Sequence, residues 1–326
     1  MVCTSTLSRK GKIMATTEVL KTTIGTLWRA GLCAGVYVVG TAVGGALVSA
    51  LGMPVPEMPV QADEKIAGVL LVVASLALAA GLTPLARRLQ GPYWLRWLTL
   101  AALCYACLGV ASPLEGAIFT TLRGMESIPV LFLPPCLLFG AAVAALFEPA
   151  HPDGAPLVAV RRFLRDRSPR QWVWRFIGAV FAFPVVYWTF GMMVAPFVMA
   201  YYQQGQFALA VPNPGVIVGT QFLRGLLFLA ASLPILVMWS GSRRQLVLAL
   251  GLAFYLLVGL FEMIQSYWLA PTLQILHNAE IFLDSMVYAL ALVLLLGRED
   301  AIGTVGPLCA HAATHDADVH QPAGSL

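Results

Sequence analysis

The chain has 326 residues, of which 59% are hydrophobic and 11% are charged, and its mean hydropathy is +0.80. Soluble domains carry about 25% charged residues, so this composition excludes a soluble globular protein and predicts an integral membrane protein. The formal net charge of +4 is small, and its distribution along the chain is more informative than its size.

Eight apolar runs are long enough to cross the hydrocarbon core of a bilayer, which takes about 20 helical residues. Open sheet edges cannot face lipid. We therefore predict an all-α, polytopic integral membrane helix bundle with about eight transmembrane helices. We place the spans at residues 24–51, 66–88, 94–121, 127–148, 171–202, 215–239, 243–268 and 271–297.

Basic residues gather in alternate loops, which sets the expected orientation by the positive-inside rule. The loops on the other side hold only Lys65 and Arg123. We therefore predict a multi-pass protein of the cell (inner) membrane with both termini in the cytoplasm. The basic residues on the cytoplasmic side are Arg9, Lys10, Lys12, Lys21, Arg87, Arg88, Arg161, Arg162, Arg165, Arg167, Arg170, Arg243, Arg244 and Arg298.

These assignments divide the chain into three parts. Residues 1–23 form a cytoplasmic N-terminal segment, in which Met14 is a second candidate start. Residues 24–297 form the transmembrane domain, and residues 298–326 form a disordered cytoplasmic tail. The first apolar run is too long for the core of a cleavable signal peptide, so we expect none.

A basic amphipathic stretch precedes the fifth span. Phe163 and Leu164 lie on its apolar side, and we expect residues 158–170 to lie on anionic lipid head groups. A basic patch this short in a multi-pass protein leads us to expect no nucleic-acid partner. The next helix is expected to start at Ser168-Pro169, because proline fits the first helical turn.

Several sequence features recur at a nearly constant offset, which suggests an internal duplication. Four spans in each half would give both halves the same orientation, a 4+4 parallel repeat. The halves would be residues 24–148 and 171–297, joined by a basic cytoplasmic loop over residues 149–170. Apolar helices also resemble one another by composition alone, and that alternative stays open. The recurring features are Trp28-Arg29 with Trp174-Arg175, Tyr105-x3-Gly109 with Tyr255-x3-Gly259, and Arg87-Arg88 with Arg243-Arg244.

A row of polar side chains interrupts the last apolar span. Its members are at helical spacing and share one helix face: Gln274, His277, Glu280, Asp284 and Tyr288. Ionisable groups inside a bilayer are costly and usually functional, so this face is a candidate site.

Other spans place polar side chains in the same outer half of the membrane when the chain is measured at about 1.5 Å per helical residue. We predict that these groups meet in one pocket beneath the external face. The candidate binding residues are Glu115, Arg224, Glu262, Gln265, His277, Glu280, Asp284 and Tyr288.

If these groups converge, the acidic side chains outnumber the fixed positive charges. Buried carboxylates in excess must be protonated, bound to a metal or surrounded by water. These states correspond to a proton relay, a metal site and a hydrophilic cavity. The structural alternative is that the polar groups only hold the helices together.

The spacing His-x2-Glu-x3-Asp supplies ligands on one helix face. We therefore consider a divalent metal ion as a cofactor, held by His277, Glu280, Asp284 and Glu262. One histidine among carboxylates suits a hard or borderline ion, but the sequence matches no strong zinc pattern such as His-Glu-x-x-His. We interpret the scattered cysteines as buried thiols.

Three hypotheses of function follow. The first is a binding or transport protein for a cation or a proton-coupled small solute, with its site open to the extracytoplasmic side. The second is an intramembrane metal-dependent hydrolase or lipid-modifying enzyme. The third is a structural or assembly subunit. The sequence contains no phosphate-binding loop, dinucleotide-binding fingerprint or nucleophile elbow, so it does not decide whether the protein is an enzyme.

Overall fold

The computed structural model describes residues 4–57, 63–149 and 155–297, and this part of the chain contains helices and no β-strand. Eight helical spans are long and apolar enough to cross a membrane, which confirms the predicted all-α, polytopic fold. The spans are Thr23–Ala50, Glu64–Ala86, Tyr93–Phe119, Met125–Leu146, Pro169–Gln203, Pro214–Met238, Arg243–Gln265 and Pro271–Leu296.

Thirteen of the helical elements carry the argument below. In chain order they are α1 (Thr4–Ala50), α2 (Glu64–Ala86), α3 (Tyr93–Cys104), the π-helix η1 (Tyr105–Ala111), α4 (Ser112–Phe119), α5 (Ile128–Leu146), α6 (Pro156–Arg165), α7 (Pro169–Gln203), α8 (Pro214–Met238), α9 (Arg243–Phe254), the π-helix η4 (Tyr255–Leu260), α10 (Phe261–Gln265) and α11 (Pro271–Leu296).

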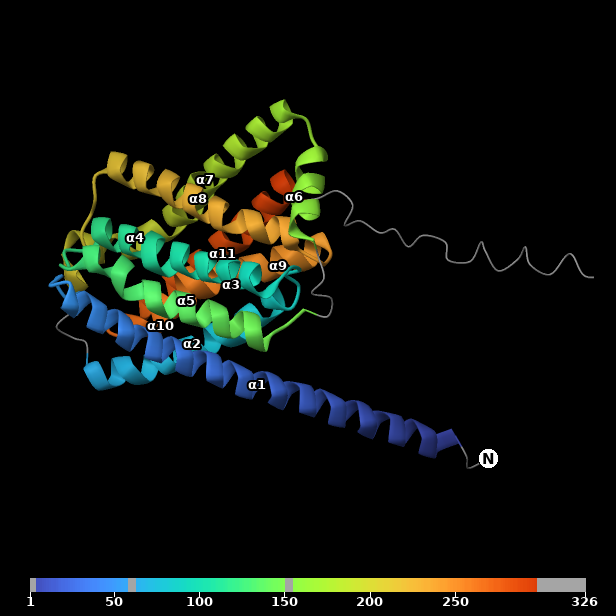
Figure 1. Cartoon of the computed structure of the whole chain (residues 1–326). Helices are drawn as coiled ribbons and strands as arrows, with labels where there is room; N and C mark the ends of the chain where they lie inside the picture. The colour runs from blue at the N-terminus through green and yellow to red at the C-terminus, as the bar shows by residue number, and fades with distance from the viewer. Residues whose placement is uncertain (1–3, 58–62, 150–154, 298–326) are drawn as a thin grey trace, which may run out of the picture.

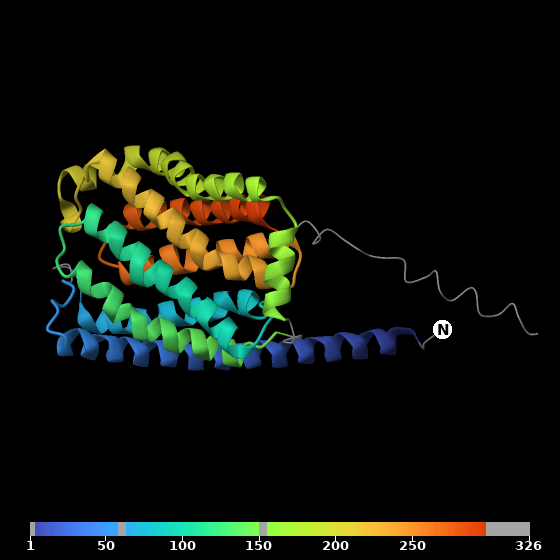
Figure 2. The same cartoon turned by 45° about the horizontal axis from the view of Figure 1, so that its top comes forward.

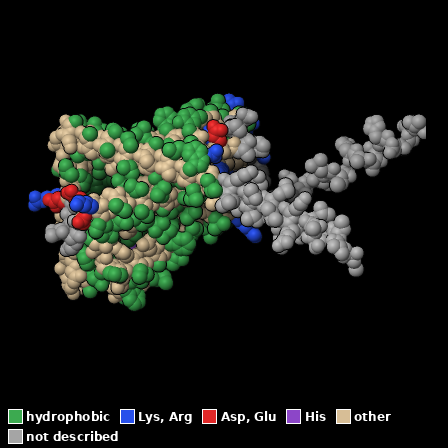
Figure 3. All heavy atoms as spheres, turned by 90° about the horizontal axis from the view of Figure 1, so that it is seen from below, with side chains coloured by type: hydrophobic (Ala, Val, Ile, Leu, Met, Phe, Trp, Pro, Cys, Tyr) green, Lys and Arg blue, Asp and Glu red, His purple; other side chains and the backbone are tan. Residues whose placement is uncertain are grey.

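The spans lie side by side in one bundle, and the N-terminal part of α1 extends beyond it at the end where α6 lies (Figures 1 and 2). We call this the basic end; it holds the connections 87–92 and 239–242 and the described residues between α5 and α7. We call the opposite end the pocket end; it holds the connections 120–124, 204–213 and 266–270 and the described residues between α1 and α2. Hydrophobic side chains cover the band between the ends, and charged side chains gather at both ends (Figure 3).

The sequence explains where several helices begin. Ser168 and Ser242 each form a capping box with the glutamine three residues later, which satisfies backbone N–H groups at the helix start. The predicted start at Ser168-Pro169 is confirmed. The first span begins at Thr23, one residue before the predicted start, and the helix that contains it, α1, extends back to Thr4. The predicted tail, residues 298–326, lies outside the described residues.

The short helix α6 lies against the bundle. Some side chains of the stretch predicted to bind lipid are buried against other helices. Phe163 is buried against Trp172, with ring centroids 4.8 Å apart, whereas Leu164 is exposed. Arg167 is also buried and donates hydrogen bonds to the carbonyls of Leu296 and Gly297 at 3.2 and 2.6 Å. It therefore caps the C-terminus of α11. Although Arg167 belongs to the stretch 158–170 that we predict to bind lipid, its side chain is used inside the protein.

The two halves of the described bundle carry matching features 150 residues apart. The π-helices η1 and η4 start at Tyr105 and Tyr255. At the basic end, the Gln90 amide donates to the Met238 carbonyl at 2.9 Å, and the Ser240 amide donates to the Arg88 carbonyl at 3.0 Å. Residue 90 corresponds to residue 240, and residue 88 corresponds to residue 238. Each of these two hydrogen bonds is therefore the counterpart of the other.

The helix contacts follow the same rule. Helix α1 packs on α2 and α5 as α7 packs on α8 and α11, and α3 packs on α5 as α9 packs on α11. Between the halves, α2 contacts α9 and α3 contacts α8. These correspondences agree with the predicted 4+4 parallel arrangement and argue against similarity of composition alone.

Close packing of α1 on α5 depends on glycine. A Cβ atom at Gly40 would lie 2.5 Å from Cα of Pro135, and one at Gly44 would overlap the backbone carbonyl of Leu131. A Cβ at Gly45 would have no atom within 4 Å. The backbones of α1 and α5 therefore touch along one face of α1.

We predict that Gly44→Val lowers the free energy of unfolding by about 3 kcal/mol, because the new side chain forces α1 away from α5. The neighbouring variant Gly45→Val is the control and should change it by less than about 0.5 kcal/mol. Unfolding of both variants in detergent micelles measures the difference. Equal stability of the two variants would contradict the packing.

Candidate functional site

The polar face of α11 lines a cavity of about 260 Å³ that extends from the part of α11 near the pocket end past the middle of this helix. His277, Glu280, Asp284 and Tyr288 all contribute to its wall. At about 1.5 Å per residue, they lie roughly 9 to 26 Å along α11 from its start at Pro271. The predicted helical face is therefore one wall of a single cavity.

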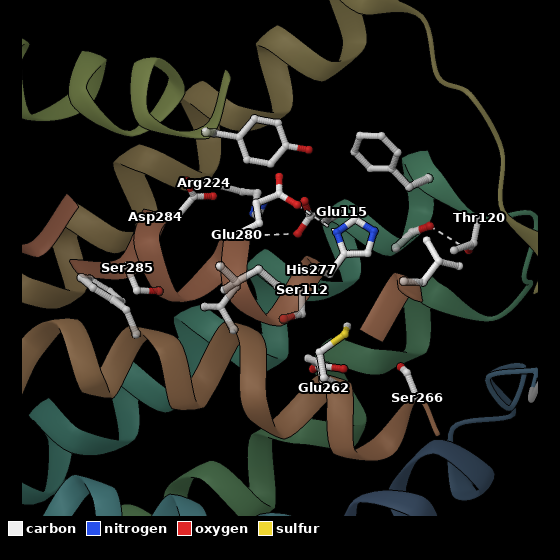
Figure 4. Close-up of a pocket in the computed structure, with 18 of the residues that line it drawn as sticks. Ser112, Glu115, Thr120, Arg224, Glu262, Ser266, His277, Glu280, Asp284 and Ser285 are labelled. Carbon is white, nitrogen blue, oxygen red and sulfur yellow. Dashed lines mark hydrogen bonds and ion pairs between the residues drawn. The ribbon is translucent and has the colours of Figure 1, made fainter. Parts of the chain in front are cut away.

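Residues from several other helices complete the wall, and four of them contribute its remaining charged and tyrosine side chains. Glu115 comes from α4, Arg224 from α8, Glu262 from α10, and Tyr187 and Tyr202 from α7. Figure 4 shows Glu115, Glu280 and His277 pointing toward one another, with Glu262 on the facing wall beside Ser112. Segments far apart in the sequence thus bring their acidic side chains to one cavity.

Gln265 and Gln274 do not line this cavity. The Gln265 amide nitrogen is buried with no hydrogen-bond partner, and the Gln274 side chain donates to the carbonyl of Ser266 at 3.0 Å. Gln265 is expected in the site from the sequence because it follows Glu262 by nearly one helical turn; both residues lie in α10, but only Glu262 lines the cavity.

Arg224 forms an ion pair with a carboxylate of the cavity wall, Glu115. Its guanidinium lies 2.7 Å from Glu115 and donates to Gln221 at 2.9 Å. Arg224 is 2% exposed, and its guanidinium also lies over the rings of Phe183 and Phe228. Its two terminal nitrogens are therefore paired, whereas its Nε is buried without a hydrogen-bond partner.

His277 links two other groups of the wall. Its Nδ1 lies 2.9 Å from the Glu280 carboxylate, and its Nε2 lies 3.2 Å from the hydroxyl of Tyr202. A neutral histidine has one N–H, so it donates on one side and accepts on the other, whereas a protonated histidine donates on both. The chain Tyr202–His277–Glu280 therefore changes its hydrogen-bond directions when His277 gains or loses a proton.

Two carboxylates have no such cationic partner among the described residues of the wall. Asp284 is 7% exposed, and its Oδ1 is buried without a hydrogen bond. Glu262 is half-buried and faces Ser112. The wall thus carries four carboxylates, one arginine and one histidine. Even with His277 protonated, the acidic groups exceed the cationic groups by two.

The first half of the chain offers an internal comparison. We align the last helix of each half on one contact: a Cβ at Gly140 would meet Ala101, and a Cβ at Gly251 would meet Met286 and then Ala289, which we match to Gly140. This gives an offset of 149 between α5 and α11, while α2 and α8 start 150 residues apart. The counterparts of Arg224, His277, Glu280, Asp284 and Tyr288 are, in order, Ala74, Ile128, Leu131, Pro135 and Phe139.

The cavity arises where the second half departs from this apolar pattern. At Leu131 the backbone of α5 touches Gly44 of α1. At the counterpart, Glu280, the nearest glycine of α7 is Gly191, and a Cβ there would meet only the Glu280 carboxylate, at 3.3 Å. Side chains and open space therefore separate α7 from α11 where backbones meet in the first half.

The four proposed metal ligands are not brought together as a metal-binding group. Within the described part of the chain, no set of three or more His, Cys, Asp or Glu side chains has an arrangement that could hold a metal ion. The buried thiols Cys33, Cys104, Cys107 and Cys136 are free, which confirms the sequence interpretation for these four.

The sequence identified the charged residues and the histidine of the wall, because ionisable groups are rare in apolar spans. It did not identify Ser112 or the role of Tyr202 as the partner of His277. Hydroxyl-bearing residues are common in membrane helices, so their sequence positions alone gave no signal. Comparison of the chain with protein-family models, with curated proteins and with solved structures finds no match.

We predict that Arg224→Met lowers the free energy of unfolding by about 3 kcal/mol, because it leaves the Glu115 carboxylate without its partner in a poorly solvated site. The double variant Arg224→Met/Glu115→Met should recover at least half of this loss. Unfolding of both proteins in detergent micelles gives the comparison. If the second substitution adds its own loss, Arg224 and Glu115 do not stabilise each other.

Proposed function

We propose that the cavity binds a small organic cation, and that the protein is a membrane binding or transport protein for such a solute. The observation that carries this proposal is the excess of carboxylates in the wall. An uncompensated carboxylate in a site of low dielectric constant is costly. A bound ammonium group, or protons that exchange with it, would remove that cost at Asp284 and Glu262.

The size of the cavity supports an organic cation over a bare metal ion. A volume of about 260 Å³ is near the lower end of the range for small-molecule sites, about 300 Å³. A single ion would leave most of this space to water. The aromatic rings of Tyr187 and Tyr202 in the wall also suit an ammonium group, because ring faces attract cations.

The apolar residues at the corresponding positions of the first half argue against a purely structural role for the polar groups of the cavity wall. Its helices pack in the same arrangement with Ala74, Ile128, Leu131 and Pro135 at the corresponding positions. Helix packing in this architecture therefore does not require an arginine, a histidine or the two acids of α11. Their presence in one half only is what a binding site would need.

The distribution of basic residues supports an orientation for this proposal. Arg87, Arg88, Arg243 and Arg244 lie at the basic end, which we place in the cytoplasm by the positive-inside rule. The cavity then opens toward the extracytoplasmic side. In this orientation the cell (inner) membrane is the expected location.

We predict that methylammonium chloride stabilises the purified protein, because a ligand that binds only the folded state adds free energy of unfolding. At 100 times the dissociation constant the gain is about 2.7 kcal/mol, which corresponds to roughly 5 °C in Tm. Thermal unfolding in detergent, with sodium chloride at equal ionic strength as the reference, measures the shift. Lower pH should reduce the shift, because protons compete for the same carboxylates.

Asp284→Asn and Glu262→Gln should each reduce this shift by at least half, while Glu64→Gln should retain it. Glu64 is an exposed carboxylate in the first turn of α2, outside the cavity wall, so it controls for the loss of one negative charge. A folded wild-type protein that gains nothing from methylammonium would overturn the proposal. So would a shift of equal size in all three variants.

A further inference from the structure

A second cavity, of about 160 Å³, lies beside the carboxylate cavity on the α7 side. Its walls come mainly from the last four turns of α7, with the α7–α8 connection and the start of α8 opposite. Gly191, Met192, Ala195 and Met199 line it from α7, and Ile217 lines it from α8. We call this space the α7–α8 groove.

The α7–α8 groove is open to the surroundings of the bundle. Met192 is 67% exposed, and Met199 and Val211 are also exposed. Met192 lies eleven residues before the end of α7 at Gln203, or about 16 Å along the helix. That distance is about half of a 30 Å hydrocarbon core. Exposed apolar side chains at this depth face lipid chains.

The groove and the carboxylate cavity share a wall. Tyr187, Tyr202, His277 and Glu280 line both spaces. At Gly191 no side chain stands between them: a Cβ there would lie 3.3 Å from the Glu280 carboxylate oxygen and would have no other atom within 4 Å. An apolar space open to lipid therefore leads directly to the acidic groups.

We propose that the ligand is a cationic amphiphile with one hydrocarbon tail, whose ammonium head occupies the carboxylate cavity while its tail lies in the α7–α8 groove. This inference rests on the proposed function and adds the class of substrate. The acidic excess at Asp284 and Glu262 matches a cationic head, and the groove offers its tail apolar walls. Met192 and Met199 suit a flexible chain, because methionine adapts its shape to what it contacts.

The same arrangement gives the ligand a route from the bilayer. An amphiphile in the outer half of the membrane already has its tail at the depth of Met192 and its head nearer the surface. It reaches Glu280 past Gly191 without carrying its tail through water. The geometry thus assigns lateral entry between α7 and α8.

The test is the dependence of affinity on tail length. Binding of n-alkylamines from methylamine to octylamine is measured on the full chain in lipid nanodiscs, with affinity referred to the free aqueous concentration. Each added methylene buried in the groove contributes about 0.8 kcal/mol, or roughly a fourfold gain in affinity. The gain should continue until the groove is filled. The n-alcohols of equal length should bind far more weakly, because they lack the charge.

Two variants connect this dependence to the groove. Ala195→Trp fills the space for the tail, and Gly191→Val narrows the passage to Glu280; each should reduce the affinity ratio of hexylamine to methylamine by at least tenfold. Val185→Trp is the matched control, because Val185 is an exposed residue of α7 that lines neither cavity. It should keep the wild-type ratio.

The outcomes separate this inference from the proposed function. If wild-type protein binds no amine of any length, the proposed function fails and the inference fails with it. If methylamine binds but affinity does not rise with tail length, only the inference is overturned. It is also overturned if both groove variants keep the wild-type ratio, or if n-alcohols bind as strongly as the amines.

Discussion

The cost of placing carboxylates in a poorly solvated interior is the constraint on which this structure depends. Arg224 offsets one acid, Glu115, at 2.7 Å, and His277 can offset a second, Glu280. Asp284 and Glu262 are left without a cation in the wall. Burying them costs free energy unless protons or a ligand supply positive charge.

The site lies where the two similar halves of the bundle differ. In the first half, Gly40 and Gly44 let α1 touch the backbone of α5, and apolar packing fills the space. In the second half, the carboxylate of Glu280 stands opposite Gly191 and holds α7 away from α11. The second half therefore lacks part of the stabilisation that close packing would contribute, and it has a cavity at that place. The closely packed first half contributes stability to the same bundle.

Much of the fold followed from the sequence, because twenty-residue apolar runs and basic loops are strong signals. The site was predicted in part: the acids at 115, 262, 280 and 284 do line one cavity, since ionisable groups in apolar spans tend to face the protein interior. Gln265 lies in α10 with Glu262 but does not line the cavity. Helical periodicity also could not predict the parts played by Tyr202 and Gly191, because the rotation and separation of the helices are set by packing between spans.

The most direct test of the central claim is infrared difference spectroscopy of the carboxyl groups in wild-type protein, with and without methylammonium. The account predicts that the cation increases the carboxylate band and decreases the protonated carboxyl band, and that Asp284→Asn and Glu262→Gln each remove part of the change. A spectrum that the cation leaves unchanged, in protein shown to be folded, would contradict it.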